Sequence, residues 1–359
     1  MNDTDDSQAL VERVLAASNT AQALAIQGGG SKAFLGMSTG DSSADVLSTL
    51  THAGVVSYEP TELVVTARSG TRLDDLIRVL DDAGQMLPFE PPRHPGATIG
   101  GVIACGLSGP RRPYAGSARD YVLGTRVING QGENLRFGGE VMKNVAGYDV
   151  SRLQTGAYGT LGVLLDISMK VLPKPEAELT LVHEAKIDQT ESMVALMRQP
   201  LPVSAMMQLD ALRYTRLSGS ESAVTAASRE LGGDVLADAD KLWAGVRDQS
   251  HAFFAASGDL WRLSVPDFAS ALPLSGSCLI NWGGAERWYV TEASAEEVYR
   301  VADAATGHAI RYRSSTDTSD GLQPVTGPMQ ALQSRLRDSF DAKRIFNRGR
   351  FHPELDNDV

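Results

Sequence analysis

The sequence has few of the residues that build disulfide frameworks and metal clusters. Its 359 residues include two cysteines, Cys105 and Cys278, which lie far apart in the chain. Two distant cysteines favour neither a disulfide framework nor the cysteine set of an iron–sulfur cluster. The chain also has six histidines, and none shows metal-ligand spacing: His52, His94, His183, His251, His308 and His352. The sequence therefore predicts no metal site.

Long apolar runs and an excess of positive charge are also missing. No apolar run approaches the roughly 18 residues that would cross a bilayer, so we expect no transmembrane segment. The start, "MNDTDDSQ", is acidic and lacks the apolar core of a signal peptide. The 33 basic and 44 acidic residues give a net charge of −11, which disfavours nucleic acid and anionic membranes as partners. The sequence predicts a reduced, cytoplasmic globular protein of about two domains.

Apolar periodicity predicts helices and strands in both halves of the chain. In the first half, a helix is expected over 7–18, and a second helix is expected to be capped by Thr71 and ended by Gly84. Strands are expected at 24–27, 62–70 and 162–173, with a hairpin at 124–139. A domain boundary is expected at 173–178, where "PKPEAE" breaks the pattern.

After that boundary the pattern indicates an antiparallel sheet with helices. Strands are expected at 179–185, 204–209, 260–265 and 278–282, and helices at 219–231 and 294–305. Gly283 and Gly284 are expected to form a two-residue hairpin turn. A last helix is expected near the C-terminus, and it carries four spaced apolar residues: Met329, Leu332, Leu336 and Phe340.

Glycine gathers in three segments, each beside an expected strand. The first is "AIQGGGSKAFLG" at 25–36. It lacks the Gly-Lys-Ser/Thr of a Walker loop and fits the Rossmann pattern only loosely, because a loop follows it instead of a helix. The others are "HPGATIGGVIACGLSG" at 94–109 and "GAYGTLG" at 156–162. Each segment alone could be a plain turn, but one elongated ligand with phosphates and a planar ring would account for all three.

The order of these motifs resembles a known family. "IQGGGSKAFLG", "ATIGG", "ARDYVLGTRVINGQGENLRFGGEVMKNVAGYD", "GAYGTLGVLLDISMKVLPKP" and "IFNRGR" together resemble the flavoproteins of the vanillyl-alcohol oxidase type, which have a PCMH-type FAD-binding domain. Within that family the chain is most similar to the smaller flavin subunits of glycolate oxidase complexes. The resemblance implies an α+β fold: a two-lobed FAD-binding domain at 1–175, a small α+β cap at 176–310 and a segment at 311–359 that returns to the first domain.

The resemblance also implies which residues bind FAD. The first loop would wrap the pyrophosphate with Gly28, Gly29, Gly30, Ser31 and Lys32. The second would line the flavin and ribityl chain with Gly96, Ala97, Thr98, Gly100, Gly101, Gly106 and Ser108. The third would pack along the other side with Gly156, Gly159, Thr160 and Gly162. Asn347 and Gly349 would return from the C-terminus to the cofactor.

The function implied is oxidation of glycolate to glyoxylate in a complex with a second flavin subunit and an iron–sulfur subunit, with any membrane association made through those partners.

Many relatives bond FAD through a histidine in the first loop. This chain has Gly30 and Ser31 there, so we expect non-covalent FAD. It lacks the His-Gly-Asp-Gly-Asn type motif of larger relatives, and no catalytic residue is identified. Two alternatives stay open: a self-sufficient FAD oxidoreductase for another 2-hydroxyacid, and a subunit whose FAD is mainly structural.

Overall fold

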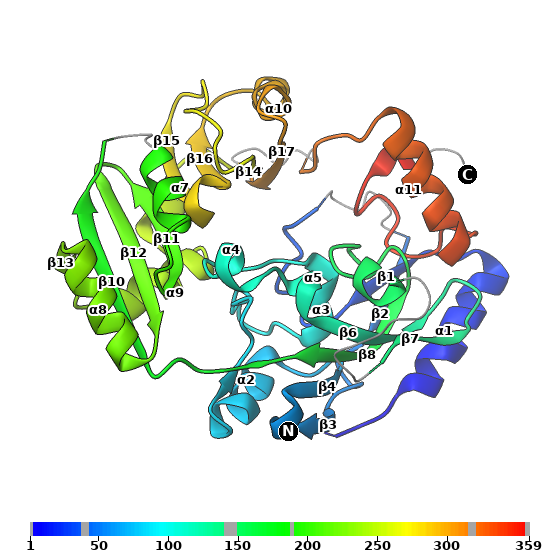
Figure 1. The fold of residues 1–359 in the computed structure, drawn as a ribbon. Helices are drawn as coiled ribbons and strands as arrows, with labels where there is room; N and C mark the ends of the chain where they lie inside the picture. The colour runs from blue at the N-terminus through cyan, green and yellow to red at the C-terminus, as the bar shows by residue number, and fades with distance from the viewer. Residues whose placement is uncertain (1–2, 37–42, 140–148, 187–189, 315–320, 356–359) are drawn as a thin grey trace.

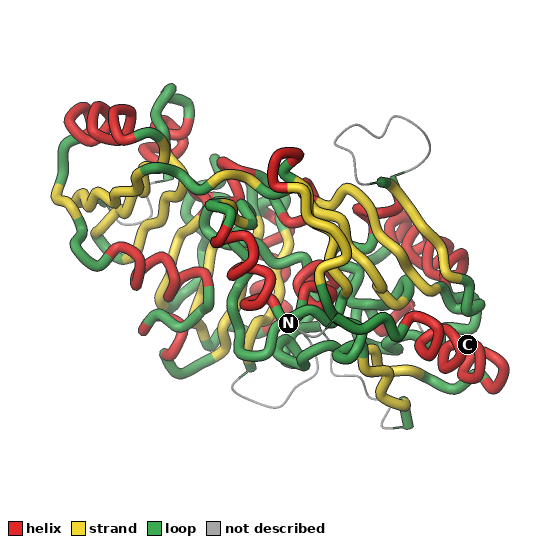
Figure 2. The backbone as a smooth tube through the Cα atoms, turned by 90° about the horizontal axis from the view of Figure 1, so that it is seen from below, coloured by secondary structure: helices red, strands yellow, loops and turns green. Residues whose placement is uncertain are grey.

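The computed structural model describes residues 3–36, 43–139, 149–186, 190–314 and 321–355. Its two large sheets are both antiparallel, and the segment after β8 carries the chain from one to the other (Figure 1). The molecule is elongated when seen from below (Figure 2). The expected α+β class is confirmed. Residues 140–148, which carry part of the motif "GGEVMKNVAGYD", lie outside the described residues.

The first sheet has five strands in the order β3-β4-β8-β6-β7. Their bounds are β3 Val55–Glu59, β4 Val64–Arg68, β6 Val122–Ile128, β7 Asn134–Gly138 and β8 Val163–Lys170. The expected hairpin is confirmed as β6 and β7, and the expected strand at 162–173 runs as β8 and then β9 Leu172–Pro173, which pairs with β5 Gln85–Met86. Short helices lie between these strands: α4 Arg112–Ala115, α5 Ala118–Tyr121 and α6 Val150–Leu153.

Two longer helices belong to this sheet, α2 Leu73–Asp82 and α3 Ile99–Cys105. The buried face of α2, Leu73, Leu76 and Leu80, shares one core with Val65 and Ile167 of the sheet. The prediction that Thr71 caps α2 was wrong. Its hydroxyl instead bonds the backbone N–H and carbonyl of Gly54 at 2.9 and 3.0 Å, so it fixes a loop rather than the helix.

A second, smaller lobe contains α1 Ser7–Thr20 and the parallel pair β1 Leu24–Gln27 and β2 Asp45–Ser48. The C-terminal segment joins it, because Phe346 pairs with Leu24 in parallel and both share a core with Leu10 and Val14. Figure 1 shows blue α1 close to the red C-terminal part of the chain. The first sheet thus contributes to two cores, because Ile128, Val163 and Leu165 of β6 and β8 pack in the core of the small lobe, which residues from both ends of the sequence complete.

The second sheet has eight strands in the order β13-β10-β12-β11-β15-β16-β14-β17. Their bounds are β10 Ala177–Glu184, β11 Val203–Leu209, β12 Leu212–Gly219, β13 Asp234–Val235, β14 Asp259–Ser264, β15 Ser277–Asn281, β16 Glu286–Thr291 and β17 His308–Arg313. Its helices are α7 Glu191–Met197, α8 Glu221–Leu231, α9 Ala239–Arg247 and α10 Ala295–Ala304. The strands and helices expected here are confirmed. The two-residue turn was wrong: Asn281 pairs with Glu286, so four residues connect β15 and β16.

The expected last helix is confirmed as α11 Gly327–Phe340. Met329 and Leu332 are each 52% exposed. The buried side chain is that of Arg337, which donates to the carbonyl of Phe346 at 3.1 Å. The ring of Phe340 also meets that of Phe137 edge to face at 6.2 Å, so both polar and aromatic contacts attach α11. Among the described residues, no helix is both long and apolar enough to span a membrane.

Candidate cofactor site

The first glycine loop lies directly against the second. A Cβ atom on Gly28 would be 2.3 Å from Oγ1 of Thr98, and one on Gly29 would be 1.7 Å from the carbonyl oxygen of Gly96. Distances this short exclude any side chain without movement of the backbone. Gly30 has a φ of +67°, which also favours glycine. The first two glycines are thus required for close contact between two backbone segments, and the third for its conformation.

The second segment contains a helix that the sequence analysis did not predict. Thr98 caps α3 by accepting a hydrogen bond from the N–H of Gly101 at 3.3 Å. The N–H of Gly100 donates to the carbonyl of Ser69 at 2.8 Å, and a Cβ on Gly100 would be 2.7 Å from the Ser69 side chain. Glycine disfavours helices, but here it lets α3 approach the end of β4.

The third segment packs on the C-terminal end of α3. The N–H of Gly156 donates to the carbonyl of Ile103 at 3.0 Å, and the N–H of Tyr158 donates to that of Ala104 at 2.8 Å. Tyr158 has a φ of +52°. The turn therefore places the Tyr158 backbone and side chain beside α3, where they face the first loop across a groove.

Asn347 closes this groove from the C-terminal segment. Its Oδ1 accepts a hydrogen bond from the N–H of Ile26 at 2.7 Å, and its Nδ2 donates to the carbonyl of Tyr158 at 2.7 Å. Its own N–H donates to the carbonyl of Leu24 at 2.9 Å. One side chain therefore joins the strand before the first loop to the third loop.

Two adjoining cavities occupy the groove. The larger, about 270 Å³, lies along the first loop, and the smaller is about 70 Å³. They share six lining residues: Ile26, Gly28, Gly101, Ala104, Tyr158 and Asn347. Shared walls make the two cavities one elongated space, as a long cofactor requires.

The predicted site residues divide into two groups. Those that line the cavities are Gly28, Gly29, Gly30, Ser31, Lys32, Thr98, Gly100, Gly101, Gly159, Gly162 and Asn347. Those that do not are Gly96, Ala97, Gly106, Ser108, Gly156, Thr160 and Gly349. Several of the second group support the walls: Gly96 lies behind Gly29, and a Cβ on Gly106 would be 3.1 Å from Gly156. Ser108 lines a separate cavity toward the cap.

The sequence analysis did not assign several lining residues. These are Thr49, Ser69, Ala104, Cys105, Tyr158 and Arg350. Small size was the only available signal for Ala104 and Cys105. Arg350 lies in the motif "IFNRGR", and its guanidinium donates to the carbonyl of Lys32 at 2.9 Å.

Positive charge lines the larger cavity. Lys32 is only 6% exposed, and its Nζ lies 3.3 Å from the hydroxyl of Ser31. Burial lowers the pKa of Lys32, and burial raises the pKa of the Cys105 thiol on the same wall. A buried ammonium without a carboxylate beside it is costly unless an anion binds. Together with Arg350 it suits a diphosphate.

These features fit FAD. The glycine backbone of the first loop lines the larger cavity, a buried lysine lines it too, and the space continues between α3 and the Tyr158 turn. Backbone N–H groups in such a cradle bind phosphate without needing a long helix. Among the described residues, no three histidine, cysteine or acidic side chains are grouped as metal ligands would be.

An apolar layer lies between the groove and the cap. Leu107 and Tyr158 of the first domain share one core with Phe254, Trp288 and Tyr312 of the cap. The Trp288 and Tyr312 rings meet edge to face at 4.9 Å. Burial raises the pKa of Tyr158 and of Tyr312, so both phenols stay protonated near neutral pH. The side chains of the cap therefore fill much of the space next to the cofactor groove.

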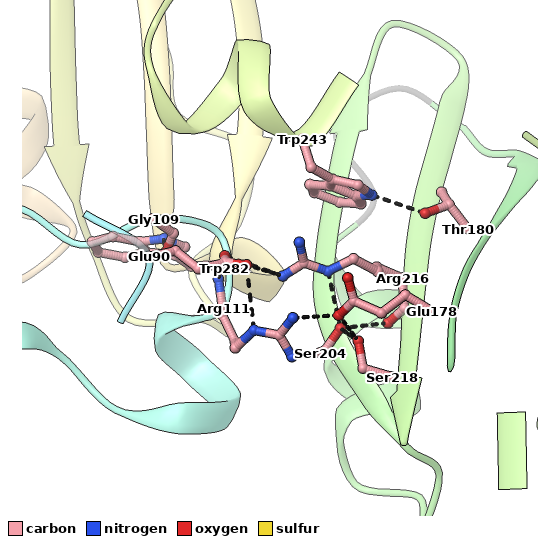
Figure 3. A network of polar contacts seen from close by, with 10 residues as sticks. All are labelled: Glu90, Gly109, Arg111, Glu178, Thr180, Ser204, Arg216, Ser218, Trp243 and Trp282. Carbon is pink, nitrogen blue, oxygen red and sulfur yellow. Dashed lines mark hydrogen bonds and ion pairs between the residues drawn. The ribbon is translucent and has the colours of Figure 1, made fainter. Parts of the chain in front are cut away.

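A polar network also fastens the cap (Figure 3). Glu90 accepts from Arg111 at 3.3 Å and forms an ion pair with Arg216 of the cap at 2.9 Å, and Arg111 also bonds Glu178. The indole N–H of Trp282 donates to the carbonyl of Gly109 at 2.9 Å. A further cavity of about 560 Å³, lined by Glu90, Arg111 and Arg216, lies beside this network rather than at the glycine loops.

Known proteins match both the domain and the whole chain. Residues 4–138 match the family described as "FAD binding domain". The chain is 47% identical over 357 residues to "Glycolate oxidase subunit GlcE" of Escherichia coli (strain K12), over 99% of this chain and 100% of that protein. It is 37% identical over 128 residues to "Glycolate oxidase subunit GlcD" of Bacillus subtilis (strain 168), over 36% of this chain and 27% of that protein.

Solved structures of alkyldihydroxyacetonephosphate synthase share the fold. One has a TM-score of 0.67 at 15% identity and covers 94% of this chain and 74% of that one. At this identity the likeness concerns the fold alone. The full-length match at 47% identity and the FAD binding domain at residues 4–138 carry the assignment: the chain has an FAD-binding domain and belongs to the glycolate oxidase subunit GlcE family.

Proposed function

We propose that the chain is the FAD-carrying subunit of a glycolate oxidase complex, which oxidises glycolate to glyoxylate and passes the electrons to an acceptor. The observation that carries the proposal is the 47% identity to a glycolate oxidase subunit over 99% of the chain. The groove supports it, because its glycine walls and buried Lys32 fit the cofactor such a subunit needs.

Bound FAD would supply the two-electron chemistry. The chain's own residues would hold it. The backbone of Gly28, Gly29 and Gly30 and the ammonium of Lys32 would bind the diphosphate, and Gly100 and Gly101 would allow the rest of the cofactor to lie against α3. Asn347 would keep the two walls of the groove together.

The partners we propose are a second flavin subunit and an iron–sulfur subunit. The chain resembles two differently named glycolate oxidase subunits, one over its whole length and one over 128 residues. Its two cysteines cannot hold an iron–sulfur cluster between them, so any such cluster would belong to another subunit. We place the complex in the cytoplasm, and any membrane contact would be made through the partners.

The experiment compares the purified chain with the reconstituted complex. Both are mixed with glycolate without oxygen, and flavin bleaching and dye reduction are measured per flavin. We expect the chain alone to bind FAD and turn over negligibly, and the complex to be active. Equal rates per flavin would instead show a self-sufficient 2-hydroxyacid dehydrogenase. A flavin of this chain that keeps its redox state during turnover of the complex would show a structural FAD.

A further inference from the structure

A buried carboxylate of the cap lies between an arginine and an amide. Glu286 is 3% exposed and Asn281 is 2% exposed. The Nε of Arg262 donates to Oε1 of Glu286 at 2.6 Å, and Nδ2 of Asn281 donates to Oε2 at 2.9 Å. Both oxygens of the carboxylate are therefore bound by neighbouring strands, β14 and the end of β15.

This arrangement lies where the cap meets the cofactor domain. Arg262, Asn281 and Glu286 line a cavity of about 10 Å³ together with Ser108 and Gly109, which follow α3. Tyr312 lines the same cavity and shares a core with Tyr158 and Cys105, which line the cofactor groove. About one layer of side chains thus separates the Glu286 carboxylate from the groove.

Two arginines lie over the ring of Trp282, which follows Asn281 in the chain. Arg262 lies over the Trp282 ring at 4.9 Å, and Arg112 of the first domain lies over the same ring at 4.3 Å. Asn281 also has a buried Oδ1 with no hydrogen-bond partner. The site therefore offers the guanidinium of Arg262, one amide donor and one unused acceptor to a ligand with a carboxylate and a hydroxyl.

Glycolate has this chemistry. The end of the Glu286 side chain is a methylene and a carboxylate, and glycolate is the same group with one hydroxyl added. Arginine with a second donor is a common way to bind a carboxylate, and the unused Oδ1 of Asn281 could accept from the hydroxyl. A buried ion pair with only a structural role can often be replaced by apolar residues without loss of stability. Such a role does not explain why Oδ1 of Asn281 is buried without a hydrogen-bond partner.

We propose that Glu286 blocks a carboxylate-binding site in the cap: its carboxylate occupies the Arg262–Asn281 site that would otherwise bind the carboxylate of a 2-hydroxyacid. The inference rests on the proposed function. It assigns no glycolate binding to this pocket of the wild-type chain. Glu286 touches neither substrate nor cofactor in this role.

The test is gain of binding by the full chain without partners. Glu286→Ala removes the methylene and carboxylate and leaves Arg262 free. The melting temperature is measured against increasing glycolate, with sodium chloride at equal ionic strength and ethylene glycol as controls. We expect a saturable rise for Glu286→Ala with glycolate only, as a ligand that binds the folded state produces. We expect no such rise for the wild type or for the Glu286→Ala, Arg262→Met double variant.

Two results would overturn the inference: a folded Glu286→Ala protein that does not respond to glycolate, or a wild type with the same saturable rise. If Glu286→Ala unfolds in buffer, refolding is followed by circular dichroism with glycolate or ethylene glycol. Refolding with glycolate alone supports the site, and failure with both contradicts it. This test measures binding by the chain without its partners, so it can fail even if the reconstituted complex oxidises glycolate. It can also succeed even if the complex is inactive.

Discussion

The side-chain amide of Asn347 donates a hydrogen bond to the carbonyl oxygen of Tyr158, 189 positions earlier in the chain, at 2.7 Å. The same side chain accepts from the N–H of Ile26 at 2.7 Å. Its φ of +43° is one that asparagine tolerates better than most residues. Three distant segments are therefore held in register by one amide.

Replacing Asn347 should weaken both the fold and the binding of FAD. In Asn347→Ala the N–H of Ile26 and the carbonyl of Tyr158 lose their partner, at about 1–3 kcal/mol for each buried group. Asn347→Asp keeps the acceptor for Ile26 but sets a buried carboxylate oxygen against the carbonyl of Tyr158, so it should lose at least as much stability. Urea unfolding and titration with FAD measure the two effects. Equal stability of Asn347→Ala and the wild type would show that water replaces the amide.

A side chain at Gly29 should prevent FAD binding. Its Cβ would be 1.7 Å from the Gly96 carbonyl oxygen, and φ at Gly29 is not positive, so the effect comes from contact and not from backbone strain. We expect purified Gly29→Ala to carry little FAD. The control is Gly84→Ala, where φ is +66° and no atom lies within 4 Å. It should lose about 1–2 kcal/mol from strain and keep its flavin. Full flavin in Gly29→Ala would make the first loop a plain turn.

FAD should be released by acid. None of the described residues that line the two cavities is a histidine. Burial raises the pKa of Cys105, so its sulfur is a poor nucleophile at neutral pH. After acid precipitation we expect all the yellow colour in the supernatant, for the wild type and for Cys105→Ala alike. Flavin in the wild-type pellet, lost in Cys105→Ala, would reveal a thioether bond.

The cap should loosen at low pH through Glu90. Burial raises the pKa of Glu90, but Arg216 and Arg111 outweigh burial, so its pKa lies below the ordinary 4.5. A carboxyl with a lowered pKa stabilises the fold above its unfolded pKa, and this contribution is lost as the pH falls through the folded pKa. We therefore expect the free energy of unfolding to fall below pH 4.5.

Glu90→Gln should remove that part of the pH dependence. It should also cost up to about 3–5 kcal/mol near neutral pH, because two arginines lose a buried partner. The measurement is urea unfolding across acidic pH. Glu221→Gln, which changes an exposed acid on α8, is the control and should match the wild type. An unchanged pH profile in Glu90→Gln would exclude Glu90 as its cause.

Local patterns in the sequence predicted most of the elements and the presence of the groove. The apolar spacing of α2 and the alternation in β6 and β7 are properties of single segments, so they could be read directly. The helix α3 could not, because its glycines disfavour a helix until Ser69 and Thr98 bond its backbone. The sequence also did not show how α11 is attached, because its buried side chain is that of Arg337 and not of a leucine.

The site was predicted where glycine signals close contact and missed where position alone decides. Nothing in the local sequence distinguishes Ser69, Thr49 or Ala104 from ordinary small residues, yet all three line the groove. Gly96 and Gly156 carry the same signal as Gly28 but support the walls from behind. Only the tertiary fold shows which glycines line the groove and which pack behind the residues that line it.

The bond between Asn347 and Tyr158 has a consequence for synthesis of the protein. Residues 345–347 pair with β1 and contribute two fully buried side chains, Ile345 and Phe346, to the core of the small lobe. Most of the groove is translated long before these residues leave the ribosome. A ribosome-bound chain that ends before residue 345 should therefore retain no flavin. Binding of FAD would then indicate that the C-terminal segment has been synthesised.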